Sequence, residues 1–266
     1  MRLRVTTWNV NSVRLRLDHL PTLIAAHNPD VLCLQETKVV DELFPRDAFA
    51  QAGFAHQQIH GQKSYNGVAI LSRVPFEPLK PRDWCAKGDC RHAVARFAGG
   101  VELHNFYVPA GGDVPDPEAN PKFAHKLDFL AEMTRVFGAR KGKRTNRLIL
   151  VGDLNIAPLE TDVWSHKQLL KVVSHTPVEV EALGAVQAAH GWIDAVRAII
   201  PPEETLYSWW SYRARDWAAA NRGRRLDHVW VTPALADAVT DARVLREARD
   251  WKPASDHAPV TVTLDV

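Results

Sequence analysis

The sequence is poor in cysteine, with only Cys33, Cys85 and Cys90 among its 266 residues. An odd and sparse set of this kind argues against a disulfide framework and is typical of a protein from a reducing compartment. The sequence also has no run of 18 apolar residues, and its first segment, MRLRVTTWNVNSVR, has no apolar signal core. We therefore expect no membrane span, no secretion signal and a cytoplasmic location.

A large excess of charge of one sign is absent too, because the net charge is only +2. Any contact with nucleic acid must therefore come from local basic patches. Residues 135–147 hold six lysines and arginines and no acid, which fits a solvated face as well as a DNA contact. Residues 212–225 hold five arginines against one aspartate, mixed with aromatic side chains. This second patch is the better candidate because it adjoins Asp227.

Several common functional motifs are missing. There is no Gly-x-Gly-x-x-Gly, no Walker loop and no recognisable serine nucleophile with its base. Cys85, Cys90 and His92 form a C-x₄-C-x-H cluster, but no fourth ligand follows at a spacing typical of zinc fingers. We therefore expect a loop with two free thiols at this place and no zinc site.

The sequence does contain strand-like and helix-like segments that alternate without a linker or a repeat. Its hydrophobic content of 46% is enough for one large core. This pattern predicts a single α/β domain over residues 1–266. The expected strands are 3–8, 31–35, 66–72, 93–97, 101–108, 147–153, 226–232 and 258–264.

Three helices are expected between these strands. Leu20, Leu23, Ile24 and His27 recur at helical spacing. A second helix covers 122–137, with Asn120 as N-cap, Pro121 at the first position and Gly138 closing the end. A third covers about 178–190, ahead of Gly191. The irregular stretch 109–121 holds four prolines and two glycines, and an ordered loop of this length is more often functional than idle.

Short polar clusters recur at what the pattern predicts to be the carboxyl ends of strands. Each alone is most simply a polar turn. Six of them are harder to dismiss, because strand ends at one edge of a sheet bring distant segments together. Crowded carboxylates also repel each other unless a cation or a proton intervenes, and hard oxygen ligands suit Mg²⁺. The clusters contain Asn9 and Asn11, Glu36 and Lys38, Tyr107, Asp153 and Asn155, Asp227, and Asp256 and His257.

The chemistry open to such a set of side chains is narrow. Hydrolysis of a phosphodiester requires a metal to neutralise the phosphate, a base to take a proton from water, and donors to hold the developing charge. Asparagine, tyrosine, histidine and carboxylates supply all three. The pattern therefore indicates a metal-dependent phosphodiesterase.

Six segments together resemble the exonuclease III family of abasic-site (AP) endonucleases, within the DNase I-like endonuclease/exonuclease/phosphatase superfamily. They are WNVNSVR, PDVLCLQETK, NGVAILS, GDLNIAP, RRLDHVW and SDHAPV, which run in the family order from about residue 1 to 264. WNVNSVR, the tyrosine of NFYVPAGG and the segment YSWWSYRARDWAAANRGRRLDH resemble exonuclease III specifically. The resemblance implies a four-layer α/β sandwich, in which two packed mixed β-sheets are flanked by helices.

The resemblance also implies a metal site. Glu36 corresponds to the principal Mg²⁺ ligand, assisted by Asn9 and Asn11. Asp256 offers oxygens to the same metal or to a second metal position. Mn²⁺ is an alternative to Mg²⁺.

Catalytic roles follow from the same resemblance. His257 is expected to contact the scissile phosphate, with Asp227 orienting its imidazole through the far ring nitrogen. Asp153 is expected to activate the attacking water and Asn155 to place it, although the identity of the general base remains open. Tyr107 is expected to hydrogen-bond the phosphate.

The implied partner is double-stranded DNA with abasic sites or with recessed or blocked 3′ ends, bound by a monomer. An aromatic side chain at Trp209 helps to wall a pocket for an extruded abasic sugar. The position of Arg224 is aromatic in some relatives, which leaves open the balance between abasic-site cleavage and exonuclease activity. The expected substrate-binding residues are Lys38, Trp209, Arg213, Asn221, Arg222, Arg224 and Leu226.

Two alternatives remain. Another phosphoesterase of the superfamily, acting on RNA, phospholipid or phosphoinositide, would share Glu36, Asp153, Asn155 and His257. Such an enzyme would not need the tryptophan- and arginine-rich segment 207–225. A nucleic-acid-binding relative without activity is less favoured, because every matched catalytic position is filled.

Overall fold

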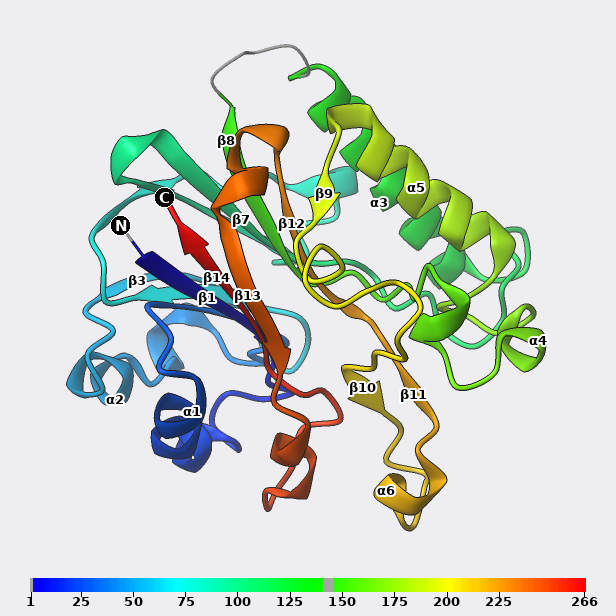
Figure 1. Cartoon of the computed structure of the whole chain (residues 1–266), viewed down its shortest axis with the longest axis horizontal. Helices are drawn as coiled ribbons and strands as arrows, with labels where there is room; N and C mark the ends of the chain where they lie inside the picture. Colours follow the sequence, from blue (N-terminus) through cyan, green and yellow to red (C-terminus); the bar gives the residue numbers. More distant parts are fainter. Residues whose placement is uncertain (1, 141–145) are drawn as a thin grey trace.

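A computed structural model of the chain describes residues 2–140 and 146–266. Two six-stranded mixed sheets pack face to face, and helices cover their outer faces (Figure 1). This is the expected four-layer α/β sandwich. None of the described helices is long and apolar enough to cross a membrane.

The first sheet has the order β13-β14-β1-β2-β4-β3, in which β1 and β2 are parallel. The second has the order β5-β6-β7-β8-β12-β9, in which β7 and β8 are parallel. The first sheet consists of β1 (Arg2–Asn9), β2 (Val31–Gln35), β3 (His56–His60), β4 (Val68–Ser72), β13 (Val239–Val244) and β14 (Val260–Asp265). The second consists of β5 (Phe76–Leu79), β6 (His92–Phe97), β7 (Val101–Tyr107), β8 (Arg147–Asp153), β9 (Ile193–Asp194) and β12 (Asp227–Val231).

The strands are apolar on both faces because each sheet is covered on both sides. In β2, Val31 and Cys33 belong to the core between the sheets, whereas Leu32 and Leu34 pack in the cluster under α1 (Leu20–His27) and α2 (Arg46–Gln51). The same alternation in β8 turns one set of side chains toward α3 (Pro121–Gly138) and α5 (Pro177–His190). Continuous apolar runs are typical of strands covered on both faces.

The ends of the long helices follow the expected chemistry, with one exception. The side chain of Asn120 accepts a hydrogen bond from the N–H of Lys122 and so caps α3. Gly191 ends α5 in the left-handed conformation at φ 72°. The expectation for Gly138 was wrong, because α3 includes this residue and is capped by Ala139 in the right-handed helical conformation. Ala139 continues the turn, so no residue with positive φ is required there.

Several short elements were not expected from the sequence. They include edge strands β3, β5, β9 and β13, and the helices α2, α4 (His166–Leu169) and α6 (Trp217–Ala220). A two-stranded ribbon of β10 (Trp209–Trp210) and β11 (Gly223–Arg224), with α6 at its tip, extends from the body of the sandwich (Figure 1). This ribbon carries the arginine-rich patch 212–225. Residues 141–145 of the other basic patch, 135–147, lie outside the described residues.

A fully buried ion pair joins α3 to α5 below the loops that follow the strands. Lys126 and Glu179 are both 0% exposed, and the Lys126 ammonium contacts the Glu179 carboxylate. Lys126 also donates to the carbonyl oxygen of Asn155 at 2.8 Å, and Glu179 accepts from the backbone N–H of Ser174 at 2.9 Å. The pair therefore holds two of the loops that form one end of the molecule.

We expect Glu179→Gln to lower the free energy of unfolding by about 3–5 kcal/mol, because it leaves the ammonium of Lys126 buried without a counter-charge. Urea unfolding followed by tryptophan fluorescence measures this loss. Glu181→Gln, an exposed change of the same kind on the same helix, serves as control and should shift stability by less than about 0.5 kcal/mol. Equal effects of the two substitutions would show that the buried pair adds nothing.

Candidate active site

The polar clusters meet at one edge of the sandwich, although they do not all follow strands. Asn9, Tyr107 and Asp153 are the last residues of β1, β7 and β8. Asp227 instead begins β12, and His257 precedes β14. The expectation that these two lie at carboxyl ends was wrong, because β12 is antiparallel to β8 and β14 is antiparallel to β1. The start of an antiparallel strand lies at the same edge, and Asp227 is paired in register with Asp153.

Glu36 directly follows β2 of the first sheet, Asp153 ends β8 of the second sheet, and Asn9 links the two side chains. The Asn9 side-chain amide donates to Glu36 Oε1 and to Asp153 Oδ2, each at 2.9 Å. The hydroxyl of Tyr107 donates to Glu36 Oε1 at 2.8 Å, and Lys38 Nζ lies 2.8 Å from Glu36 Oε2. Tyr107 therefore hydrogen-bonds to one oxygen of the Glu36 carboxylate, and Lys38 forms an ion pair with the other.

His257 joins the two sheets from the other side. Its Nδ1 lies 2.9 Å from Asp227 Oδ2, and its Nε2 lies 3.6 Å from Asp153 Oδ2. The same Asp227 oxygen accepts a hydrogen bond from the hydroxyl of Ser208 at 2.6 Å. All four side chains are buried. Asp227 therefore fixes the imidazole through Nδ1 and leaves Nε2 directed toward Asp153.

Burial and neighbouring charge shift the pKa values of this group. Burial disfavours the imidazolium of His257, but the carboxylates of Asp227 and Asp153 outweigh burial and raise the pKa of His257. Burial raises the pKa of Asp153 above its ordinary value, and the charges of Asp227 and Glu36 act in the same direction. The site therefore favours a protonated imidazole beside a carboxyl that is easily protonated.

Burial also disfavours the charged form of Glu36, but Lys38, together with hydrogen bonds from Asn9 and Tyr107, outweighs it and lowers the pKa of Glu36. Asp256 behaves in the same way, because the charge of His257 and hydrogen bonds from Asn11 and Trp209 lower its pKa despite burial. These two carboxylates are held in the ionised form.

The backbone around these residues is strained. Asn11, Glu36, Lys38 and Asn155 all have positive φ, between 45° and 55°. Such strain is concentrated at sites where the surrounding structure fixes a side-chain direction. Gly152, at φ 139°, permits a close approach, because a Cβ there would lie 1.9 Å from the carbonyl oxygen of Phe106. The tight contact between β7 and β8 sets the position of Asp153.

Asn155 and Asn11 are fixed by hydrogen bonds within the cluster. The backbone N–H of Asn155 donates to Asp153 Oδ1 at 2.9 Å, and its side-chain amide donates to the carbonyl of Val108 at 2.9 Å. Asn11 donates to Asp256 Oδ1 at 3.0 Å and accepts from Lys38 Nζ at 2.7 Å. Asn11 therefore connects Asp256 to the group around Glu36.

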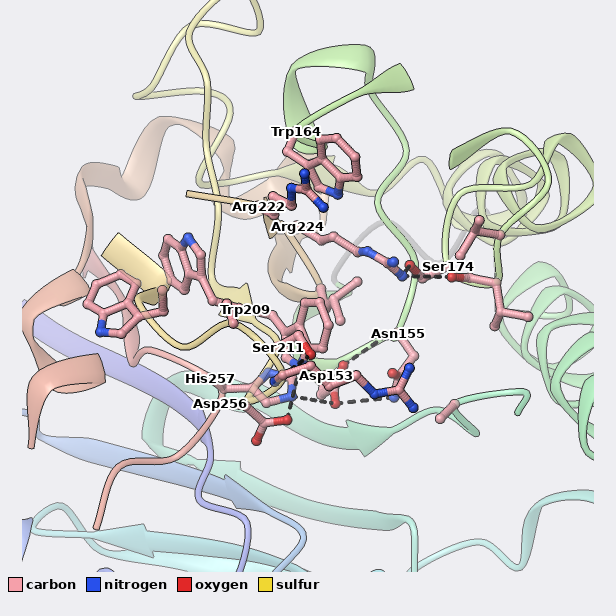
Figure 2. Close-up of a pocket in the computed structure, with 18 of the residues that line it drawn as sticks. Asp153, Asn155, Trp164, Ser174, Trp209, Ser211, Arg222, Arg224, Asp256 and His257 are labelled. Atoms are coloured by element: carbon pink, nitrogen blue, oxygen red, sulfur yellow. Dashed lines mark hydrogen bonds and ion pairs between the residues drawn. The ribbon is translucent and has the colours of Figure 1, made fainter. Parts of the chain in front are cut away.

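A cavity of about 810 Å³ opens above these side chains (Figure 2). Glu36, Tyr107, Asp153, Asn155, Asp256 and His257 line one end. Of the expected substrate-binding residues, Trp209, Arg213, Arg222, Arg224 and Leu226 line its wall. The loop 109–121 contributes Ala110, Gly112 and Asp113, so it is part of the site.

Asn221 does not line this cavity. Its side-chain oxygen accepts from Trp210 Nε1 and from Arg246 Nη2, each at 3.1 Å, and it lies in a separate groove. The structure therefore does not bring Asn221 to the other substrate-binding candidates.

Three further residues that the sequence patterns did not predict belong to the site. Ser208 holds Asp227, Trp164 lines the cavity, and Ser174 accepts a hydrogen bond from Arg224 at 2.7 Å. Ser208 lies within the segment that resembles exonuclease III, but a serine between aromatic residues carries no signal of its own. Trp164 and Ser174 lie in irregular loops, where no period reveals which side chains face inward.

The donors at this edge suit a hard divalent cation. Among the described residues, Asp153, Asp227 and His257 form a group of potential ligands whose atoms lie within 4.8 Å of one another. Asp227 Oδ1 is buried and has no hydrogen-bond partner within the described ranges. Such an oxygen is costly unless a donor or a cation meets it. Glu36, Asn9, Asp256 and Asn11 lie around this group and remain the predicted Mg²⁺ ligands.

In the cluster of Cys85, Cys90 and His92, both cysteines are free of disulfide bonds, and the side chain of His92 hydrogen-bonds to that of His104 at 3.0 Å.

Comparison with known proteins identifies the family. The model of the Endonuclease/Exonuclease/phosphatase family matches residues 6–257. Exodeoxyribonuclease III of Haemophilus influenzae is 28% identical over 97% of this chain and 98% of its own length. The structure of an AP endonuclease from Archaeoglobus fulgidus superposes with a TM-score of 0.89 at 31% identity, over 99% of this chain and 100% of the other. The chain belongs to the exonuclease III/AP endonuclease family.

A second similar structure contains bound DNA. The 3′ phosphatase NExo from Neisseria, in complex with a product DNA hairpin, superposes with a TM-score of 0.89 at 34% identity, over 99% of this chain and 100% of that one. The chain is accordingly a phosphodiester-cleaving nuclease of the exonuclease III/AP endonuclease family.

We expect Asp227→Asn to lower the pKa of His257 by about one to three pH units, because the carboxylate that outweighs burial is removed. An NMR titration of the histidine ring in the metal-free protein measures this change. In the wild type the ring should stay protonated well above its ordinary range, whereas in the variant it should lose its proton at lower pH. Asp237→Asn, an exposed change in the turn between β12 and β13, should leave the titration unaltered, and an unaltered titration in Asp227→Asn would refute the assignment.

Proposed function

We propose that this protein is a Mg²⁺-dependent DNA repair nuclease that cleaves the phosphodiester 5′ to abasic sites and removes nucleotides or blocking groups from 3′ ends of duplex DNA. The observation that carries the proposal is the placement of His257 between Asp227 and Asp153, at the floor of a cavity whose wall holds arginine and tryptophan. The relatives support DNA as the substrate, because they include an exodeoxyribonuclease, an AP endonuclease and a 3′ phosphatase solved with DNA.

In this proposal His257 binds the scissile phosphate. Its raised pKa keeps the imidazolium protonated, so Nε2 donates a charge-assisted hydrogen bond to a phosphate oxygen. Asp227, which is itself held by Ser208, fixes the ring, so little reorganisation is needed as charge develops. The predicted contact of Tyr107 with the phosphate requires its hydroxyl, which lines the cavity, to give up the hydrogen bond that it donates to Glu36.

Asp153 is the proposed base for the attacking water. Its raised pKa makes it a better proton acceptor than an ordinary aspartate. The hydrogen bonds from Asn9 and from the N–H of Asn155 fix the direction of its carboxylate. The side chain of Asn155 lines the cavity beside it and places the water.

Glu36, Asn9, Asp256 and Asn11 are the residues that would hold Mg²⁺, or Mn²⁺ in its place. When bound, the ion neutralises phosphate charge and stabilises the leaving oxygen. Lys38 keeps Glu36 ionised in this proposal, through the 2.8 Å contact between the two side chains.

Arg213 and Arg222 are the proposed contacts to the DNA backbone. Both are exposed and line the cavity mouth, where guanidinium groups reach phosphate oxygens. Trp209 and Leu226 provide an apolar wall for the part of the substrate that enters the cavity. Their positions close to His257 support a substrate whose sugar leaves the helix.

Two duplexes test the proposal, one with a single abasic analogue and one undamaged with a recessed 3′ end. With Mg²⁺ the protein should incise 5′ to the analogue and shorten the recessed end, and EDTA should abolish both reactions. His257→Ala should reduce kcat by about 10³-fold or more, whereas His56→Ala, on edge strand β3, should not. Folded protein that cleaves neither duplex would contradict the proposal and would direct the search to RNA and phospholipid substrates.

A further inference from the structure

Arg224 is a partly buried cation that lacks an anionic partner. Arg225, its neighbour, is buried against Asp162 and Asp194 at 2.8 and 2.7 Å. In the part of the chain that the structure describes, no carboxylate lies within ion-pair distance of Arg224. Its Nη1 donates instead to the carbonyl of Val173 at 2.8 Å and to the hydroxyl of Ser174 at 2.7 Å. The charge of Arg224 is therefore oriented but not neutralised.

The position of this charge is fixed by the ribbon of β10 and β11. Trp209 and Arg224 are paired in register, and the guanidinium lies 5.2 Å from the centre of the Trp209 ring. On its other edge the indole N–H of Trp209 donates to Asp256 Oδ2 at 3.0 Å. A continuous line of contacts therefore connects the catalytic end of the cavity to Arg224. Figure 2 shows Arg224 reaching from the ribbon to Ser174 across the wall of the cavity.

The guanidinium of Arg224 retains unused donors. The contacts to Val173 and Ser174 use Nη1 alone, so among residues 2–140 and 146–266 Nη2 makes no hydrogen bond and is the donor available to a ligand in the cavity that Arg224 lines. Nε also has no partner there, and it is buried. Burial lowers the pKa of Arg224, and the charge of Glu179 opposes this effect. A buried donor on a cation is costly until an acceptor meets it, and most costly when no anion is near.

The charges that line the cavity are divided between its two ends. Glu36, Asp153 and Asp256 gather at the catalytic end. On the opposite wall Arg222, two residues before Arg224, lies 4.7 Å from the ring centre of Trp164. Two arginines, each held on a tryptophan face, give this wall a positive potential that favours an anion.

We propose that Arg224 forms a second anion subsite in the cavity, which binds an anionic oxygen group on the fragment that leaves with the scissile phosphate. A neutral deoxyribose presents hydroxyl and ring atoms to this wall and leaves the guanidinium without a counter-charge. A carboxylate or phosphate one step beyond the scissile phosphate pairs with it. This inference rests on the proposed function, since it names which DNA ends and lesions that activity prefers.

Two sources supply such an anion. One is the carboxylate of a 3′-phosphoglycolate, a blocking fragment left at a broken 3′ end. The other is the internucleotide phosphate on the 3′ side of an abasic residue. Each has a matched substrate without the anion. For the glycolate end it is the neutral glycolamide ester of the same 3′-phosphate, and for the abasic duplex it is the same duplex with a neutral methylphosphonate at that linkage.

The test compares kcat/KM for these four substrates in the wild type, Arg224→Gln and Arg224→Lys. Arg224→Gln keeps an amide donor and removes the charge, and Arg224→Lys restores the charge. Arg243→Gln, an exposed change on β13, is the control for net charge. The ratio between matched substrates is taken within each variant, so a partly folded preparation does not alter it.

Arg224→Gln should reduce the preference for the anionic member of one pair by roughly tenfold or more, as expected for loss of a charge-assisted hydrogen bond. Arg224→Lys should keep most of that preference, and Arg243→Gln all of it. A loss in the glycolate pair identifies the carboxylate, and a loss in the abasic pair identifies the phosphate. Unchanged ratios in both pairs would overturn the subsite. Wild-type protein that cleaves none of the four would instead overturn the proposed function itself.

Discussion

The site depends on hydrogen bonds that join two otherwise apolar sheets at one end. Most of the interface between the sheets is hydrocarbon, but at this edge polar side chains meet across it. Gln35 of the first sheet donates to Asn105 of the second at 2.7 Å, and Tyr107 donates across to Glu36 at 2.8 Å. The bond between His257 and Asp227 has the same character, because Asp227 begins β12 of the second sheet and His257 lies just before β14 of the first. Buried polar groups of this kind must be paired, so the pairs fix how the sheets meet.

This constraint explains the electrostatics of the site. Because the sheets exclude water, each carboxylate at the edge needs a donor or a cation, and the same burial raises the pKa of Asp153. The imidazolium of His257 lies beside two of these carboxylates and offsets one unit of their charge, and Lys38 offsets that of Glu36. The cluster still holds more negative than positive groups. A divalent cation would supply the missing positive charge and would at the same time attract the phosphate of a substrate. Glu36 and Asn155 adopt strained backbone conformations with positive φ because only these direct their side chains into the cluster.

Much of this architecture was predictable from the sequence, for physical reasons. Strands covered on both faces leave continuous apolar runs, and α3 and α5 have strong capping residues, so both were found. The short edge strands and the ribbon of β10 and β11 were not, because two to six residues without alternation give no period. The polar clusters identified which side chains belong to the site. They did not reveal that Asp227 and His257 begin their strands, since the direction of a strand depends on its pairing. The family resemblance also placed Asn221 among the substrate-binding residues, whereas its contacts with Trp210 and Arg246 turn its side chain into another groove.

The central claim is that Asp227 acts through His257, as one unit that spans the two sheets. A double-mutant cycle on the cleavage of an abasic duplex tests it most directly, with kcat measured for Asp227→Ala, His257→Ala and the double variant. Asp227→Ala should slow the wild type strongly and should have little further effect once the imidazole is gone, because its role is to hold that ring. If the two losses multiply in the double variant, Asp227 and His257 act independently, and the bond between the sheets is not what organises the site.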